Sequence, residues 1–291
     1  MTVRGRVETI SDAGKIQHYC LSFDGKDPGV TCNANNILDG SKTLIELVHR
    51  PDSAVTKHVN INADKIDYWK IGITLAEVDL ARASLLSDGV IVSEPKQFLD
   101  VGYLCHLNDP DGYSIELLHH RFKPHQQTHP ALSASKSKSQ PALGQITLRI
   151  KDSGPTLQFY QHELGMRLLS RQIIVPHRFT LYFLAFTEEQ PPSADLDDVN
   201  NREWRWQRPY TVLELQHIWG TEHGDFSYRV TPDTGFVQLS LLARDIDEVV
   251  AKLRTNGAAV SRTQWFEASL NSNAATVLDP DGYTVRLIEA A

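Results

Sequence analysis

A carboxylate in the first half of the chain is matched by a cation in the second half. The sequence Asp-Pro-Asp-Gly-Tyr occurs at residues 109–113 and again at 279–283, and each copy leads into a segment with alternating apolar residues. That segment carries Glu116 in the first copy and Arg286 in the second. A carboxylate can bind a divalent cation or move a proton, whereas a guanidinium can do neither, so only one copy keeps this chemical capacity.

Two further positions recur at one constant spacing between the halves. Glu46 lies in Thr-Leu-Ile-Glu-Leu and its counterpart Glu214 lies in Thr-Val-Leu-Glu-Leu, while Lys70 corresponds to Gln238 within a second pair of matched segments. Matches that keep one spacing along the chain indicate an internal duplication. The two copies can therefore be compared position by position.

Periodicity predicts the elements that must position these side chains. Residues 144–150 alternate as a strand, and a segment with helical spacing opens at Ser153 and ends at Gly165. Three strands follow this helix, at residues 167–175, 179–186 and 210–217. The same order then repeats, with a strand at 236–242 and a helix capped by Asp245. Each repeat reads as βαβββ, which predicts an α+β fold built from paired βαβββ units.

The duplication and a polar segment predict the domain boundaries. Residues 121–141 lack periodicity and contain three prolines, so they cannot build a core and are expected to form a linker. We therefore expect a first module at 1–120 and a second at 142–291. Residues 3–10 match the second strand of the βαβββ order, so the first module is predicted to lack its opening strand and helix.

Composition excludes several classes of partner. A length of 291 residues suits two domains, and a net charge of −7 argues against nucleic acid or an anionic membrane surface. No apolar run approaches the roughly 20 residues of a membrane span, and no signal peptide core is visible, so we expect a cytoplasmic location. The three cysteines lack the spacing of a disulfide framework or a zinc site and are expected to be reduced.

The second module resembles the glyoxalase I (lactoylglutathione lyase) family of the vicinal-oxygen-chelate superfamily. The resemblance covers nearly all of residues 142–291, and the first module shows it more weakly through Glu46, the segment around Lys70 and the turn at Asp109. The matching motifs of the second module lie at residues 145–152, 159–166, 179–184, 213–222 and 279–283. The whole chain is similar to fused two-module members of this family.

The resemblance implies a zinc or nickel site between the modules. In the family, a Gln or His and a Glu from one module meet a His and a Glu from the other. On this pattern Gln145 and Glu214 form one pair, and Glu116 completes three ligands, with Glu116 and Glu214 as the catalytic carboxylates. Lys70 stands where the family has His, and an ammonium group cannot bind a metal.

The second site implied by the resemblance is also incomplete. It would contain Glu46 and Gln238, with Arg286 in place of a ligating Glu, and we expect no metal there. Lys70 beside Glu116 and Glu214 should stay protonated, and Arg286 could pair with Glu46. Each former metal cavity would then contain a built-in cation.

Two structural alternatives remain open for these residues. Lys70 would point to solvent if the strand register slipped by one residue, because alternate side chains face opposite ways. Gln145 and Glu214 could be ordinary interface residues that satisfy each other's hydrogen bonds.

The resemblance further implies a substrate site. Arg149 stands where the family has an arginine that binds the glutathione carboxylate, and Lys96 lies near the place of a glutathione lysine in the first module. Ile218 and Thr234 replace an Asn and an Arg of the glutathione pocket, and residues 265–273 lack the family's lysines, so glutathione binding is expected to be weak. The apolar walls of the cavity would come from Phe179, Leu181, Phe183 and Trp219.

Two further clusters favour structural interpretations. No predicted element fixes the histidines beside the linker, so solvation is favoured over metal binding for His119, His120, His125 and His129. An aromatic cluster in or beside an insertion favours a lid or packing, with a docking surface left open; it comprises Trp204, Trp206, Trp219 and Tyr210.

The leading functional prediction is glyoxalase I-like handling of a small carbonyl compound or thiol adduct where the modules meet. The replaced metal ligands argue against lactoylglutathione lyase activity, and an active protein would be a lyase or isomerase of that kind. The alternative is a non-catalytic protein that binds and sequesters a small molecule. A third class of function is that of a structural partner protein. A smaller possibility is metal-independent chemistry with Lys70 as a base or Schiff-base amine. The chain could also form a homo-oligomer.

Overall fold

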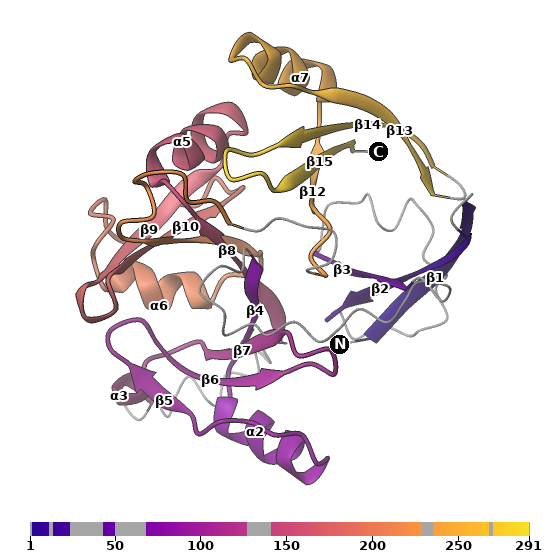
Figure 1. The fold of residues 1–291 in the computed structure, drawn as a ribbon. Helices are drawn as coiled ribbons and strands as arrows, with labels where there is room; N and C mark the ends of the chain where they lie inside the picture. The colour runs from indigo at the N-terminus through magenta and orange to yellow at the C-terminus, as the bar shows by residue number, and fades with distance from the viewer. Residues whose placement is uncertain are drawn as a thin grey trace. The chain divides into compact units, whose positions relative to one another are not determined.

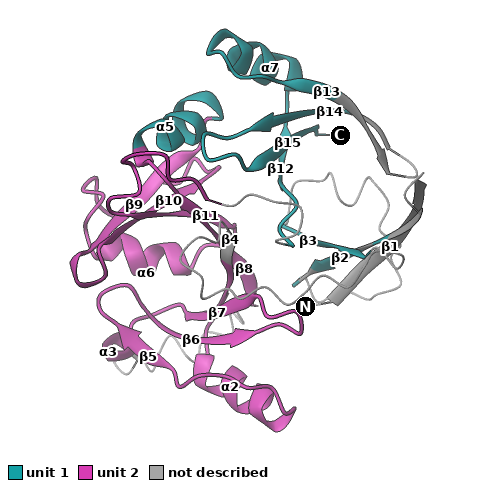
Figure 2. Ribbon diagram, viewed as in Figure 1, with its two compact units in different colours: residues 1–57, 154–164, 230–291 teal, residues 58–153, 165–229 magenta. Residues whose placement is uncertain are grey.

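The computed structural model describes residues 2–11, 14–23, 43–49, 68–126, 141–228, 235–267 and 270–290. Their contacts divide the chain into two compact units, coloured separately in Figure 2. Unit 1 comprises residues 1–57, 154–164 and 230–291, and unit 2 comprises residues 58–153 and 165–229. These units are defined by spatial contacts, and they combine segments from both sequence modules.

Unit 2 is built on an eight-stranded sheet, whose strand order is β5-β6-β7-β4-β8-β11-β10-β9. The first four strands along the chain are β4 (Tyr68–Leu75), β5 (Lys96–Phe98), β6 (Gly102–Asn108) and β7 (Ser114–His119). The others are β8 (Ala142–Ile150), β9 (Arg167–Ile174), β10 (Phe179–Ala185) and β11 (Val212–Ile218). Strands β4 and β8 pair antiparallel in the middle of the sheet and join its two halves (Figure 1).

Short helices accompany this sheet. They are α2 (Val78–Ser87), α3 (Lys123–Gln126), a 3₁₀ turn at Val175–His177 and α6 (Asn200–Trp206). Helix α6 lies between β10 and β11, in the insertion that carries Trp204 and Trp206 of the aromatic cluster. The predicted linker is only partly irregular, because Phe122 is buried and α3 follows it. Residues 127–140 of that linker lie outside the described residues.

Unit 1 contains two smaller sheets. Strands β1 (Thr2–Ser11), β2 (Gly14–Ser22) and β3 (Ile45–His49) form one of them, in that order. The other has the order β12-β15-β14-β13, with bounds Leu239–Ala243, Thr284–Glu289, Leu270–Leu278 and Ser261–Glu267. The helical segments of unit 1 are α5 (Ser153–Leu157), a π-helical turn at Gln158–Glu163 and α7 (Ile246–Thr255). The described elements together form the predicted α+β fold.

The duplicated Asp-Pro-Asp-Gly-Tyr turns have the same hydrogen bonds in both copies. Oδ1 of Asp109 accepts from the backbone N–H groups two and four residues later, and Oδ1 of Asp279 does the same. Gly112 and Gly282 have φ values of 95° and 92°, a region that glycine occupies without a Cβ clash. Each turn therefore directs the chain into the strand that carries Glu116 or Arg286.

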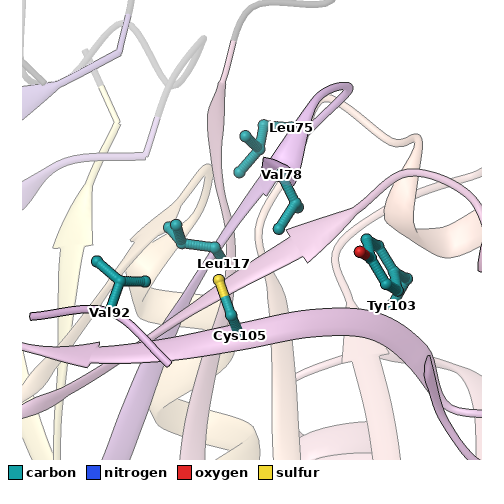
Figure 3. Close-up of a cluster of buried hydrophobic side chains, with 6 residues drawn as sticks. All are labelled: Leu75, Val78, Val92, Tyr103, Cys105 and Leu117. Carbon is teal, nitrogen blue, oxygen red and sulfur yellow. The ribbon is translucent and has the colours of Figure 1, made fainter. Parts of the chain in front are cut away.

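One face of the eight-stranded sheet in unit 2 carries an apolar core beside α2. It contains Leu75, Val78, Val92, Tyr103, Cys105 and Leu117, which Figure 3 shows pointing toward one another. Burial raises the pKa of the Cys105 thiol to about 11, so this cysteine is a neutral apolar group at physiological pH. Because side chains alternate along a strand, the neighbours of Cys105 and Leu117 face the other side of the sheet.

No helix among the described residues is long and apolar enough to cross a membrane.

Candidate functional site

The opposite face of the eight-stranded sheet, called here the polar face, brings together side chains from both halves. One cross-strand row contains Glu214, Thr147 and Lys70, from β11, β8 and β4. The next row contains Gln145, Gly72, Glu116 and His106, from β8, β4, β7 and β6. Paired residues of neighbouring strands point to the same face, so these rows form one cluster.

Lys70 and Glu116 form a buried ion pair in this cluster. Lys70 Nζ lies 2.7 Å from Glu116 Oε1, and both side chains are 5% exposed. His106 Nε2 lies 3.1 Å from the same carboxylate oxygen. The register of β4 thus turns Lys70 inward rather than toward solvent.

Gln145 connects the two carboxyl groups of the cluster. Its Nε2 donates to Glu116 Oε2 at 3.2 Å and also donates to Glu214 Oε2, which accepts a second hydrogen bond from Thr147 Oγ1 at 2.7 Å. Gly72 lies between Gln145 and Glu116 in the cross-strand row. A Cβ at Gly72 would come within 3.0 Å of the Gln145 Cβ, so glycine leaves room for the amide to reach across.

The two carboxyl groups have pKa values that move in opposite directions. Burial favours the neutral form of both, but Lys70 and then His106 outweigh this effect and hold the pKa of Glu116 at about 2. The pKa of Glu214 is raised, because burial dominates and the charge of Glu116 adds to it, while Lys70 opposes. Glu116 is therefore the more acidic carboxyl group of the pair, and Glu214 is the more basic one.

The donor groups of this cluster can be tested against a divalent metal ion. The Gln145 Oε1 atom is buried and lacks a hydrogen-bond partner among the described residues, which would suit a ligand oxygen. The amide nitrogen, however, faces both carboxylates, and the Lys70 ammonium lies against Glu116. Within the described chain, no group of three or more His, Cys, Asp and Glu residues could hold a metal ion. Because Lys70 and Gln145 already satisfy the carboxylates with N–H donors, this arrangement does not fit a divalent ion.

Arg205 is a further charged residue of the polar face, and no motif or spacing in the sequence predicts its place there. Its Cζ atom lies 3.3 Å from the ring centroid of Phe183 and 4.0 Å from that of Trp206. Burial lowers the pKa of Arg205 well below its ordinary value against the pull of Glu214 and Glu116, yet a guanidinium keeps its proton in proteins. The one hint in the sequence is that Arg205 stands between Trp204 and Trp206, in an insertion without hydrophobic periodicity.

The aromatic insertion is largely packing. Trp206 is buried, meets Phe183 edge to face, and donates from Nε1 to the Val101 carbonyl at 3.1 Å. These two aromatic residues form an apolar cluster on the same side of the sheet as the polar residues, together with Leu104, Leu118, Leu181 and Val212. Trp204 lies beneath the Arg208 guanidinium, 4.9 Å from it, and Tyr210 is only partly buried.

The expected substrate residues are not all on this face. Phe179, Leu181 and Phe183 alternate along β10 and share the polar face with Arg149, whose Nε donates to Gln216 Oε1 at 3.2 Å. Trp219 donates instead to Thr180 Oγ1 at 2.9 Å, and Thr180 faces the other side of β10.

Other residues considered for glutathione lie apart from the cluster. Ile218 is half-buried at the end of β11, and Lys96 is exposed on the edge strand β5. Thr234 and part of 265–273 lie outside the described residues.

The second set of expected residues belongs to unit 1. Glu46 is exposed on β3, and half-buried Gln238 donates to Ser240 Oγ at 3.1 Å. Arg286 lies on β15, and its buried Nε has no hydrogen-bond partner in the described part of the chain.

The interpretation of the histidines as solvated is wrong for two of them. His119 is buried, and burial lowers its pKa. The pKa of His120 falls to about 4, chiefly because of burial and then because of the charge of His119. His125 Nδ1 lies 2.8 Å from Glu203 Oε2, and His129 is outside the described residues. The three described histidines of this group, His119, His120 and His125, are dispersed structural groups.

Comparison with known proteins places this geometry in context. The family described as "Glyoxalase/Bleomycin resistance protein/Dioxygenase superfamily" matches residues 142–287. A lactoylglutathione lyase of Pseudomonas aeruginosa is 36% identical over 147 residues, which cover 50% of this chain and 80% of that protein. Glyoxalase I of Saccharomyces cerevisiae is 31% identical over 164 residues, and the match spans 54% of this chain and 48% of the yeast protein.

Longer matches include both halves of the chain. A lactoylglutathione lyase of Schizosaccharomyces pombe is 26% identical over 279 residues, covering 92% of this chain and 82% of that protein. The crystal structure of glyoxalase I from Zea mays is similar with a TM-score of 0.64 at 19% identity, and the similarity covers 99% of this chain and 83% of the maize chain. At this identity the maize structure supports the fold alone.

Proposed function

Because this chain belongs to the glyoxalase/bleomycin resistance protein/dioxygenase superfamily, we propose that it handles a small carbonyl compound, or a thiol adduct of one, on the polar face of unit 2. The relatives named as lactoylglutathione lyases support the glyoxalase I-like part of this proposal. The reaction would be a proton transfer between neighbouring carbons of the substrate.

The observation that carries the proposal is the asymmetry between Glu214 and Glu116. Moving a proton from a carbon beside a carbonyl needs a base whose pKa is raised toward the working pH. Glu214 has such a pKa because it is buried, whereas Glu116 is held ionised by Lys70 and His106. Glu214 is therefore the proton-transfer group that we propose, and Glu116 is the anion that keeps Lys70 in place.

Two cations flank Glu214 on the same face. Removing a proton beside a carbonyl leaves negative charge on the substrate oxygen, and fixed positive charges in a dry site stabilise such an oxyanion. Lys70 shares a cross-strand row with Glu214, and the charge of Arg205 interacts with the carboxyl group of Glu214. In this proposal the protein's own ammonium and guanidinium groups provide the electrostatic stabilisation.

The cosubstrate is the less supported half of the proposal. Arg149 stands on the polar face, but it already bonds Gln216, and Ile218 and Thr234 offer no charge for the carboxylates of glutathione. A small carbonyl compound is therefore favoured over its glutathione adduct.

The second candidate function is binding without catalysis. Its support is that Lys70, Gln145 and Thr147 already satisfy the two carboxyl groups, so the cluster is stable without a reacting partner. Such a protein would hold a small molecule beside Phe179, Leu181 and Phe183.

Deuterium exchange separates these two functions. The protein would be incubated in D2O with methylglyoxal, dihydroxyacetone or the hemithioacetal of methylglyoxal and glutathione, and NMR would follow exchange of the carbon-bound protons. We expect enzyme-dependent exchange that Glu214→Gln reduces about a hundredfold or more, in line with loss of a general base. Exposed Glu188 provides the matched control as Glu188→Gln. No exchange above background with any of the three compounds would remove the catalytic proposal and favour the binding function.

A further inference from the structure

Three neighbouring side chains of the polar face have buried polar atoms without hydrogen-bond partners in the described chain. They are the Ser170 hydroxyl, both amide atoms of Gln172, and all three guanidinium nitrogens of Arg205. Ser170 and Gln172 are fully buried, and Arg205 is 1% exposed. Buried polar groups in folded proteins are normally bonded, so three together require a physical reason.

The strand register brings these side chains to one place. Ser170 pairs with Phe183 and Gln172 pairs with Leu181 across β9 and β10, so all four point to the polar face. The Arg205 guanidinium lies over the Phe183 ring. Phe183 in turn pairs with Glu214 on its other side, so strand β10 alone separates Ser170 and Gln172 on β9 from the strand of the proposed proton-transfer residue.

Three other arginines show that residues of the insertion between β10 and β11 can accept hydrogen bonds from guanidinium groups. Arg171 makes a two-bond fork with Asp197, at 2.8 and 2.6 Å. Arg202 donates to the carbonyls of Asp100 and Asp197, and Arg208 donates to Glu189 and to the Trp204 carbonyl. Arg205 alone among these four has no hydrogen bond in the described structure.

The two carboxyl groups whose charges act on Arg205 already accept hydrogen bonds from other residues. Glu214 accepts from Gln145 and Thr147, and Glu116 accepts from Lys70 and Gln145. Both act on Arg205 through charge, but neither forms a salt bridge with it among the described contacts. No group in the described part of the chain therefore accepts a hydrogen bond from this guanidinium.

A carboxylate is the chemical group that matches these donors. The guanidinium presents paired N–H groups in a planar fork that a carboxylate accepts with both oxygens. The Gln172 amide and the Ser170 hydroxyl add neutral donors beside it. Stacking on Phe183 holds the guanidinium plane, and partly exposed Phe98, Phe179 and Tyr210 border this core.

We propose that Arg205, Gln172 and Ser170 form a carboxylate-binding subsite of the polar face, and that the small carbonyl compound handled there is the anion of a carboxylic acid. The position of its carbonyl beside Glu214 rests on the function proposed above. The carboxylate lies beside the Arg205 guanidinium, which itself lies over Phe183 on the strand next to that of Glu214.

Calorimetric titration with two matched probes tests this subsite. Pyruvate carries a carboxylate beside its carbonyl, and methyl pyruvate carries the same carbonyl without the charge. We expect the unmodified protein to bind pyruvate about tenfold or more tightly than the ester, as loss of a charge-assisted pair requires. Arg205→Met should abolish this preference, whereas Arg208→Met, which removes a charge from the same insertion, should retain it.

A second variant keeps the test informative if Arg205→Met does not fold. Gln172→Leu removes the amide donor and leaves the cation and the Ser170 hydroxyl, so it should reduce the preference severalfold while far-UV and near-UV circular dichroism stay unchanged. An unchanged preference in Gln172→Leu, combined with an unfolded Arg205→Met, assigns Arg205 a structural role and overturns the proposal.

The outcomes separate this subsite from the proposed function. Equal binding of pyruvate and its ester overturns the subsite and leaves carbonyl handling standing. Binding of neither probe overturns the subsite, and the deuterium exchange experiment then decides the carbonyl function separately. If acetate binds as tightly as pyruvate and depends on Arg205, the subsite stands and the carbonyl function fails. Equal losses in Arg205→Met and Arg208→Met show general charge attraction and overturn the subsite.

Discussion

Lys70 and Glu116 form an ion pair in the middle of the eight-stranded sheet, with Nζ and Oε1 2.7 Å apart and both side chains 5% exposed. Burial alone would raise the pKa of Glu116, yet Lys70 and then His106 hold it at about 2. The sheet thus contains a fixed positive charge at the position where the family resemblance implies a metal ligand. Its neighbour Glu214 is left as the titratable carboxyl.

Removing the cation of this pair should strongly destabilise unit 2. Lys70→Met leaves Glu116 buried without its main partner, and breaking a buried ion pair in this way costs about 3–5 kcal/mol. The free energy of unfolding, measured by urea titration at pH 7, should fall by an amount in this range.

The double variant Lys70→Met with Glu116→Leu is the matched control for that loss. Because it removes both charges, it should recover most of the stability. A Lys70→Met protein as stable as the unmodified chain would mean that the pair is solvated and that the buried arrangement is wrong.

Gly72 should control the contact between Gln145 and Glu116. A methyl group at Gly72 would come within 3.0 Å of the Gln145 Cβ and of Leu118 Cδ1. Gly72→Ala should therefore displace the Gln145 amide and cost about 1–3 kcal/mol, as overpacked cores do. Denaturant unfolding measures this cost.

Gly102→Ala provides a control in the same sheet, since its nearest contact would be an ordinary 3.5 Å from Trp206 Nε1. It should change stability much less than Gly72→Ala does. Equal effects of the two substitutions would show that crowding at Gln145 is not the cause.

Asp279 should make the stability of the protein depend on pH. Its pKa is raised from 3.8 to about 7, mainly by burial and then by the charge of Asp281, although Tyr160 and the turn N–H groups donate to it. A carboxyl whose folded pKa is raised stabilises below its ordinary pKa and loses that contribution as pH rises. Stability should therefore fall between about pH 4 and pH 7.

Asp279→Asn removes this ionisation while keeping an acceptor for the turn. The variant should match the unmodified protein near pH 4 and exceed it by a few kcal/mol at pH 8, on the order expected for such a shift. Unfolding by urea at both pH values measures the difference. Asp109→Asn, in the less buried copy of the turn, serves as the control, and a pH response that survives Asp279→Asn would place its origin elsewhere.

The features that the sequence predicted are those that depend on local rules. The two Asp-Pro-Asp-Gly turns need an Asp acceptor and a glycine with positive φ, and both requirements are visible in the residues. Asp245 was recognised as a cap, and its side chain does accept from the N–H of Glu248. Alternation also placed Glu116 on a strand, and the constant spacing matched Lys70 with Gln238 of the strand predicted at 236–242.

The features that the sequence could not predict depend on distant partners. Arg205 lies on a short helix in an insertion without hydrophobic periodicity, and its burial results from Phe183 in another strand. The burial of His119 likewise depends on what packs around it. The meeting of β4 and β8, which brings Lys70 near Gln145, was implied by the family resemblance and not by a pattern in either strand.

Restoring a metal-binding side chain at Lys70 should create a metal site on the polar face. In Lys70→His, a neutral imidazole replaces the ammonium, and the Gln145 amide can turn its oxygen toward Glu116 and Glu214, so four N and O ligands become available. Elemental analysis after dialysis against zinc or nickel should find about one ion per chain in the variant, and its melting temperature should rise with metal, as binding to the folded state requires. Lys70→Met, which removes the ammonium without adding a ligand, should bind no ion and show no rise. A stoichiometric ion in the unmodified protein would show that the Lys70 ammonium leaves the cluster, and the built-in cation would then no longer explain why this face differs from a metal centre.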